Sequence, residues 1–386
     1  MNGVRFLLIS DENKITSKTV KHDTTPILME GFKDHSLHNY KNVLVARFVA
    51  LGDVAMTIPV LYSVCDANSD TNFVIITNLV ASTLFINKPN NLEVIGVDVK
   101  GRYKGFAGIV RLYNDIRKKH KIDVFIDLQD SPRTWALGAL FTLGGTPVKR
   151  MHKGRRGKWA LTRRFNKRMF PLISSRERYR EVFYRSGFTF KETFKSIYGG
   201  SVPPQELFAE ISAPKKEGER WIAIAPFAKY DAKIYPLHLM KKVVEEVASW
   251  ENVKVFLFGA GEHEKTILGQ WAGEHENVTS VAVKRYGFPV ELPLLSRCDV
   301  MVSMDSANMH LASLVCVPVV SIWGATHPYC GFMGWHQDIN NAVQLNMLCR
   351  PCSVIGDKPC RFKDFFCLAG IAPSLIVSHI KEVIEK

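Results

Sequence analysis

The sequence predicts an α/β protein built from two βαβ domains that face a central cleft. Short apolar runs alternate with helix-like stretches along most of the 386 residues, and this alternation is typical of parallel sheets covered by helices. The alternation stops near residue 150 and restarts near residue 221, which indicates two such units. We expect an extension at residues 1–40, one domain at 41–205 and another at 206–386.

The first half contains four apolar runs with the length of buried strands. These runs are residues 42–46, 73–77, 92–97 and 122–128. Helical spacing of apolar residues appears at 54–65 and 106–120. Residues 11–40 show no clean period, so we expect an irregular lead-in. Residues 149–168 interrupt the pattern with ten basic residues and no acidic residue.

A linker containing two adjacent prolines is expected at residues 196–219. The second half then repeats the alternation, with strands expected at 221–225, 253–258, 300–304 and 318–323. Helices are expected at 236–250, 290–297, 306–314 and 373–385. Ligands of open α/β sheets bind at the carboxyl ends of the strands, so functional residues are sought there.

Composition excludes several classes of protein. With 46% hydrophobic and 23% charged residues, the chain is neither wholly disordered, nor collagen-like, nor a multi-span membrane protein. The longest apolar stretch, residues 311–323, is broken by Pro318 and is shorter than the ~20 residues of a membrane helix. Residues 1–10 show no cleavage-like site, so we expect a cytoplasmic protein.

The charge is concentrated in the first half of the chain. Residues 1–205 hold 33 Lys and Arg against 17 Asp and Glu, whereas residues 206–386 hold 18 against 20. A net charge of +16 in one half favours an anionic partner: nucleic acid, an acidic membrane surface or a phosphorylated substrate. The alternative is a solvated basic surface that keeps the protein soluble.

Polar residues follow two of the expected strands. Gly52 and Asp53 come after the first strand, where Asp53 is either a helix N-cap or a general base for an acceptor hydroxyl. Lys229 and Lys233 follow the first strand of the second half. A lysine there suits a phosphate or diphosphate, although it can equally be a surface lysine.

The segment around Asp305 is the most informative. An apolar strand ends at Asp305, and the small residues Ser306 and Ala307 open a helix that contains His310. Amides at a helix N-terminus bind phosphate oxygens; the alternative is a capped helix with a buried histidine. Gly259 and Gly261 lack the third glycine of a dinucleotide fingerprint, and no Walker A sequence occurs.

Four of the eight cysteines cluster near the C-terminus. They are Cys349, Cys352, Cys360 and Cys367. In a cytosolic protein disulfides are disfavoured, so one interpretation is a structural metal site with four thiolates. The gaps of seven and six residues are not those of a standard zinc ribbon, and the nearby Arg350, Arg361 and Lys363 favour a basic loop near the ligand instead.

Four segments, in their order and spacing, resemble the bacterial lipopolysaccharide heptosyltransferase family, glycosyltransferase family 9. They are residues 43–59, 127–134, 233–236, and 302–310 followed by 322–328. The resemblance implies a GT-B fold with two Rossmann-like domains. It also implies inverting, metal-independent transfer of a sugar, typically from ADP-heptose, to a hydroxyl of the lipid-linked inner core, with no cofactor besides the nucleotide sugar.

The resemblance also implies roles for individual residues. Asp53 would be the general base, and Lys233 would balance charge on the leaving diphosphate. The donor site would comprise Lys229, Glu262, Tyr286, Asp305, Ser306, Ala307 and His310, with Glu264 as a competitor of Glu262. The first domain would bind the acceptor through Arg133, Arg155, Arg156, Arg163 and Arg164.

An anionic glycolipid acceptor implies a peripheral protein at the inner-leaflet surface of the inner membrane, with no nucleic-acid partner expected. Trp159, Phe165, Met169 and Phe170 stand among the basic residues and suit an interface. Departures from the family pattern at Val49, Ala50, Met56 and 306–307 leave the donor sugar open. The alternatives are a weak relative that uses another nucleotide sugar, a silent scaffold, or a basic nucleic-acid-binding protein.

Overall fold

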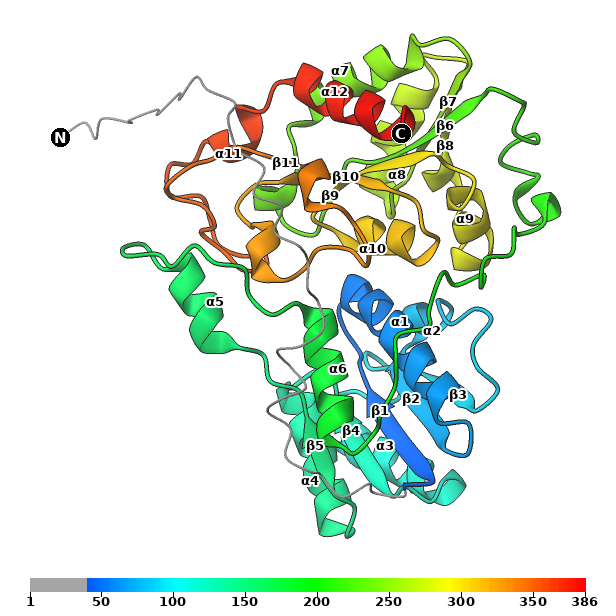
Figure 1. Cartoon of the computed structure of the whole chain (residues 1–386), viewed down its shortest axis with the longest axis vertical. Coiled ribbons are helices and arrows are strands. Elements are labelled where there is room, and N and C mark those ends of the chain that lie inside the picture. The colour runs from blue at the N-terminus through cyan, green and yellow to red at the C-terminus, as the bar shows by residue number, and fades with distance from the viewer. Residues whose placement is uncertain (1–39) are drawn as a thin grey trace. The chain divides into compact units, whose positions relative to one another are not determined.

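The computed structural model describes residues 40–386, and its first sheet has five parallel strands in the order β3-β2-β1-β4-β5 (Figure 1). The strands are β1 (Asn42–Ala46), β2 (Asn72–Asn78), β3 (Leu92–Val97), β4 (Val124–Asp127) and β5 (Val148–Arg150). Every residue of β1 from Val43 to Ala46 is buried. This run is continuous rather than alternating because helices cover both faces of the sheet.

Six helices accompany this sheet. They are α1 (Leu51–Ala67), α2 (Leu79–Ser82), α3 (Gly105–Lys119), α4 (Pro132–Leu143), α5 (Arg155–Thr162) and α6 (Ser175–Arg185). Val43 and Val45 share an apolar cluster with residues of α1 and α6. Leu44 and Ala46 share another with residues of α3 and α4. Because strand side chains alternate between faces, α1 and α6 cover one face, and α3 and α4 cover the other.

The second sheet has six parallel strands in the order β11-β10-β9-β6-β7-β8. Its strands are β6 (Arg220–Ala225), β7 (Val253–Leu257), β8 (Val278–Ser280), β9 (Val300–Met304), β10 (Val319–Trp323) and β11 (Ala342–Gln344). Its helices are α7 (Leu237–Ala248), α8 (Glu262–Ala272), α9 (Phe288–Leu295), α10 (Ala307–Leu314), α11 (Phe366–Ala369) and α12 (Pro373–Ile384). Residues of α7, α8 and α12 pack with Ile222 and Ile224 of β6, whereas residues of α9 and α10 pack with Trp221 and Ala223.

Short 3-10 turns connect several of these elements. They are η1 (Gln205–Phe208), η2 (Asp231–Lys233), η3 (Val281–Val283), η4 (Pro328–Cys330) and η5 (Ile339–Asn341). The turn η2 matters most for the site because Lys233 is its last residue.

Helix α1 of the first sheet packs against helix α10 of the second (Figure 1). Gly52 permits this close approach, because a Cβ at that position would lie 2.6 Å from His310 Cδ2. One apolar cluster therefore runs from Val54 and Ile58 of α1 to Met309 and Leu311 of α10.

The structure confirms the predicted α/β class: two parallel sheets, each with helices on both faces. The expected strands match β1–β4, β6, β7, β9 and β10 within two residues at each end. The elements not predicted from the sequence are α2, α4, α5, α6, α8, α11, β5, β8 and β11. The domain boundary at residue 205 stays a prediction, and the expected extension lies outside the described residues except for Tyr40. Within residues 40–386, no helix is both long and apolar enough to cross a membrane.

Candidate functional site

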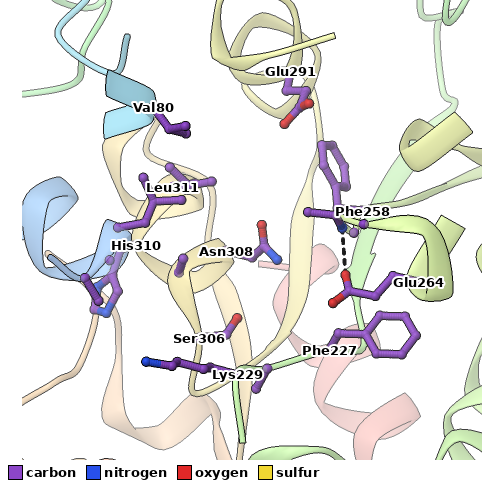
Figure 2. Close-up of a pocket in the computed structure, with 18 of the residues that line it drawn as sticks. Val80, Phe227, Lys229, Phe258, Glu264, Glu291, Ser306, Asn308, His310 and Leu311 are labelled. Atoms are coloured by element: carbon purple, nitrogen blue, oxygen red, sulfur yellow. Dashed lines mark hydrogen bonds between the residues drawn. The ribbon is translucent and has the colours of Figure 1, made fainter. Parts of the chain in front are cut away.

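A cleft of about 960 Å³ lies at the carboxyl ends of β1, β6 and β9. The start of α1 lines one side through Gly52 and Asp53, and Lys233, Asp305 and the start of α10 line the other. Figure 2 shows how Lys229, Ser306, Asn308 and His310 surround this space. The structure therefore brings together in one cleft the residues predicted for catalysis and most of those predicted for the donor.

Asp53 is the third residue of α1, not its N-cap, which is Ala50. Its Oδ2 lies 2.5 Å from Arg47 Nη2 and accepts a hydrogen bond from the Ala50 amide at 3.2 Å. Arg47 is buried and also donates to the Leu128 carbonyl at 2.6 Å. Within the described part of the chain, Oδ1 of Asp53 accepts no hydrogen bond, so one carboxylate oxygen is held and the other stays available.

Lys233 and Asp305 form an ion pair on the opposite side of the cleft. Lys233 Nζ lies 3.0 Å from Asp305 Oδ2, and the Thr326 hydroxyl donates to the same oxygen at 2.7 Å. The Asp305 side chain is buried, with 6% of its surface exposed. A buried carboxylate without partners would be strongly destabilising, so Lys233 and Thr326 together explain how Asp305 is accommodated.

The N-terminus of α10 opens into the cleft beside this pair. Ser306 is the N-cap residue, Ala307 begins the helix, and no side chain caps the first amides. Exposed amides at a helix start attract anionic groups, which the helix dipole also favours. The arrangement suits a diphosphate whose second partner is the Lys233 ammonium.

His310 lies one turn into α10 and is buried against Gly52. Burial lowers the pKa of its imidazole to about 4, against the opposing effects of Asp305 and Asp53. The ring is therefore neutral near pH 7. Its Nδ1 is buried without a hydrogen-bond partner among the described residues.

Glu262, the expected donor glutamate, and its competitor Glu264 both line the cleft, and the role of Glu262 stays a prediction. Glu262 is the first residue of α8, and 80% of its side chain is exposed. Its carboxylate lies 4.0 Å from the Lys265 ammonium. Glu264 turns back, accepts the Ala260 amide at 2.6 Å and lies between Phe227 and Phe258 (Figure 2). Burial raises the pKa of Glu264. We conclude that geometry favours Glu264 as the carboxylate facing a donor.

Of the other two residues predicted to bind the donor, one lines the cleft and the other does not. Lys229 lines the cleft (Figure 2), with its ammonium 5.1 Å from the centre of the Tyr230 ring. Tyr286 is not among the residues that line the cleft; its neighbours Lys284 and Arg285 are. Spacing alone located the correct loop but not the side chain that faces the space.

The arginines predicted to bind the acceptor do not line the cleft. Arg133 donates to the carbonyls of Tyr103 and Val99 at 3.0 and 3.3 Å, which ties the loop between β3 and α3 to α4. Arg155 pairs with Asp130 at 2.8 Å. Arg163 and Arg164 stack on exposed aromatic rings, and Arg156 is exposed. Their acceptor role stays a prediction.

Lys158 is the basic residue of α5 that turns toward the cleft. Its ammonium lies 5.0 Å from the centre of the Phe332 ring, and Phe332 lines the cleft. Burial lowers the pKa of Lys158 to about 8; the charge of Arg178 acts in the same direction, and Asp53 opposes it. The sequence alone does not single out Lys158, because α5 is not predicted as a helix and its inward-facing position therefore cannot be identified.

The four clustered cysteines are free thiols: Cys349, Cys352 and Cys360 lie in the loop beside Arg350, and Cys367 lies in α11. Arg350 is buried and donates to the carbonyls of Gly324, Thr326 and Leu345. In residues 40–386, no three His, Cys, Asp or Glu side chains are grouped to hold a metal ion. The metal interpretation of Cys349, Cys352, Cys360 and Cys367 thus gains no support and stays a prediction.

Comparison with known proteins gives consistent results. The lipooligosaccharide heptosyltransferase 2 of Campylobacter jejuni subsp. jejuni serotype O:6 (strain 81116 / NCTC 11828) is 22% identical over 338 residues, covering 86% of this chain and 96% of the relative. Among solved structures, a family 9 glycosyl transferase from Veillonella parvula DSM 2008 has a TM-score of 0.68 at 17% identity, covering 89% of this chain and 97% of the other.

The E. coli heptosyltransferase WaaC, solved with ADP, has a TM-score of 0.61 at 18% identity, covering 89% of this chain and 99% of that structure. These likenesses confirm the predicted GT-B fold. The family model for glycosyltransferase family 9 (heptosyltransferase) matches residues 109–363. Because this match covers more than half of the sequence, the chain belongs to glycosyltransferase family 9, the heptosyltransferases.

Proposed function

We propose that this protein transfers heptose from ADP-heptose to a hydroxyl of a lipopolysaccharide or lipooligosaccharide inner core. The observation that carries the proposal is the placement of Asp53 opposite Lys233, Asp305 and the start of α10 in one cleft. The relative from Campylobacter jejuni is named a lipooligosaccharide heptosyltransferase, and the WaaC structure contains ADP. Both support the choice of donor and acceptor.

In the proposed step, the acceptor hydroxyl attacks the anomeric carbon of the donor sugar. A new C–O bond forms, the bond between that carbon and the diphosphate oxygen breaks, and ADP leaves with the bonding electrons. Asp53 takes the hydroxyl proton on its available Oδ1 while Arg47 and the Ala50 amide hold Oδ2. Attack opposite the leaving group inverts the anomeric configuration.

Lys233 and the amides of α10 stabilise the negative charge that develops on the leaving diphosphate. Asp305 holds the Lys233 ammonium in place at 3.0 Å and is positioned to contact the sugar. Because these groups supply a positive potential without a metal, we propose metal-independent transfer. The matching experiment is assay after treatment with EDTA and 1,10-phenanthroline: retained turnover supports this part, and loss restored by a metal overturns it.

The acceptor of such a reaction is an anionic glycolipid, and we propose that Lys158 recognises one of its charged groups. The Lys158 ammonium makes no hydrogen bond or ion pair within the described residues, yet it is close enough to Asp53 for their charges to interact. We further propose that the protein works on the cytoplasmic side of the inner membrane as a peripheral protein.

The decisive experiment measures ADP release with ADP-heptose and a Kdo-bearing lipid A acceptor for the wild type, Asp53→Asn and Asp70→Asn. Asp70 is exposed and away from the cleft, so its variant controls for the loss of one carboxylate. We expect acceptor-dependent release in the wild type and Asp70→Asn, and a loss of about 10²–10⁴-fold in Asp53→Asn. Equal release in all three proteins would remove Asp53 from the role of base.

A further inference from the structure

Two segments expose large apolar side chains on the surface beside the cleft. In and after α5, Trp159 is 64% exposed and Phe165 is 70% exposed. Between β11 and α11, Leu348 is 91% exposed. Further exposed apolar residues in the two segments are Met169, Phe170, Ile173, Ile355 and Phe362. Such concentrations of exposed apolar residues mark interaction surfaces rather than ordinary solvated faces.

Direct contacts join the two segments into one surface. Lys167 donates to the carbonyls of Cys349 and Pro351, and the Leu172 amide donates to Tyr329 at 2.9 Å. Figure 1 shows α5 beside the orange loop that leads to α11. We name the exposed residues of 155–173 and 348–363 the docking surface. It is composite, because the first sheet's half supplies one segment and the second sheet's half supplies the other.

The docking surface is strongly basic. Residues 155–173 hold seven basic residues and no acidic residue, and the second segment exposes Lys358, Arg361 and Lys363 against one acidic residue, Asp357. Guanidinium groups lie over the exposed rings: Arg163 over Trp159 at 5.2 Å and Arg164 over Phe165 at 4.8 Å. Each large ring therefore sits directly beside a positive charge.

We propose that the docking surface binds a bilayer rich in anionic headgroups. Its aromatic rings would insert at the boundary between headgroups and acyl chains, and its cationic side chains would contact the headgroups. Aromatic side chains beside Arg and Lys match both layers of such an interface. A second copy of the protein fits less well, because pairing two such surfaces would bring two sets of like charges together. This proposal rests on the proposed function in one respect: the glycolipid acceptor of that function lies in the bilayer that the docking surface would bind.

The docking surface continues into the catalytic cleft. Ile355 lines the cleft, and Gly356 packs so closely on the Lys233 stem that an added Cβ would lie 2.4 Å from Lys233 Cδ. On the other segment, Lys158 contacts Phe332 of the cleft wall. Binding a bilayer on this surface therefore places the cleft entrance at the headgroup level, where a glycolipid's sugars lie.

Flotation with vesicles of phosphatidylcholine alone, or mixed with phosphatidylglycerol, tests the proposal on the full-length protein. Trp159→Ser/Phe165→Ser probes the first segment and Leu348→Ser/Phe362→Ser the second. The matched control is Phe106→Ser/Leu143→Ser, because both residues are exposed on α3 and α4. We expect selective binding to anionic vesicles, at least about tenfold weaker in either test variant and unchanged in the control.

A charge series separates the two contributions. Arg163→Gln/Arg164→Gln is expected to weaken binding by about 25-fold, since each basic residue near an anionic surface changes affinity about fivefold, and Arg163→Lys/Arg164→Lys is expected to restore most of it. Melting temperatures confirm that the variants fold. The proposal is overturned if the wild type does not bind anionic vesicles, or if neither serine pair weakens that binding. If the wild type instead self-associates without binding vesicles, and the serine pairs abolish that self-association, the surface is assigned to a second copy of the protein.

Turnover with a deacylated, water-soluble acceptor distinguishes this proposal from the proposed function. The two serine-pair variants are expected to keep that turnover, because they spare Asp53, Lys233, Asp305 and the arginines predicted to bind the acceptor. If soluble turnover is absent from every protein while anionic vesicles are still bound, the proposed function fails and the docking surface stands. If soluble turnover is normal and vesicle binding is absent, only the docking surface fails.

Discussion

The guanidinium of Arg47 lies 2.5 Å from Asp53 and fixes one oxygen of that carboxylate at the first turn of α1. Arg47 is itself held by the Leu128 carbonyl at the end of β4. Opposite effects act on the guanidinium: burial lowers its pKa, the Asp53 charge raises it, and the net shift is upward. Two strand ends thus set the direction of one carboxylate before any substrate arrives.

Arg47→Lys is expected to lower kcat by about 10- to 100-fold while leaving the Kd for ADP unchanged. A lysine keeps the positive charge but cannot contact Leu128 and Asp53 together, and a misplaced catalytic group costs rate rather than donor affinity. Steady-state kinetics and calorimetry provide the measurement. Arg102→Lys is the control, because Arg102 forms a surface pair with Asp115 at 2.8 Å; an equal loss in both variants would contradict the assignment.

Glu264→Gln is expected to weaken ADP binding by about 10- to 100-fold, because hydrogen bonds to a charged partner contribute about 1.5–3 kcal/mol. Glu262→Gln, in the same helix with the same loss of charge, is expected to change Kd less than about twofold, since that side chain is 80% exposed. Titration calorimetry with ADP compares the two. A larger effect at Glu262 would restore it as the donor carboxylate.

Gly52→Ala is expected to destabilise the fold and impair turnover, because the new methyl group would lie 2.6 Å from His310 Cδ2. Forcing an extra carbon into a packed contact costs about 1–3 kcal/mol. Gly269→Ala in α8 is the control; an added Cβ there meets nothing within 4 Å, and alanine favours a helix over glycine. Measured by urea unfolding, the free energy of unfolding should therefore fall in Gly52→Ala and rise in Gly269→Ala. Equal stabilities of the two variants would contradict the close packing of α1 on α10.

The buried His310 makes folding stability depend on pH. Its pKa is lowered to about 4 in the folded chain, whereas an unfolded histidine takes up its proton near pH 6.5. The unfolded state therefore binds more protons below pH 6.5, and stability decreases as pH falls. Between pH 7 and pH 5 the contribution lost is about 2 kcal/mol.

His310→Gln removes this titration, so its unfolding free energy should vary less with pH over that range. The exposed His238 provides the control through His238→Gln, which should keep the wild-type slope. Urea unfolding at several pH values measures both. A wild-type slope in His310→Gln would show that the histidine is not buried in its neutral form.

The strands were predictable because buried parallel strands form continuous apolar runs, and β1 and β9 match their expected ends. Helices α5 and α6 were missed because charged residues dominate them; α5 buries only Leu161. Asp53, Lys233 and Asp305 were predictable as residues that follow strand ends. Their partners were not predictable: Thr326 follows a different strand, β10, and the contact of Arg47 with Asp53 depends on how the turn after β1 folds.

Side-chain direction was the main limit at the donor site. Glu262 and Glu264 differ by two positions in α8, which turns a side chain by more than half a revolution. Both line the cleft, and the start of α8 at Glu262 determines that Glu264 is the one whose side chain turns back to the Ala260 amide. Similarly, the spacing that suggested Tyr286 found the right loop, but Lys284 and Arg285 line the space.

The apolar cluster shared by α1 and α10 also constrains how the enzyme can move. Its residues belong to both sheets, so pulling the two halves straight apart would expose buried core to water, at about 25 cal/mol per Å². Rotation about the Gly52–His310 contact leaves that core covered. We therefore expect this contact to act as a pivot, so that substrate entry and ADP release proceed by a rocking of the two halves around it.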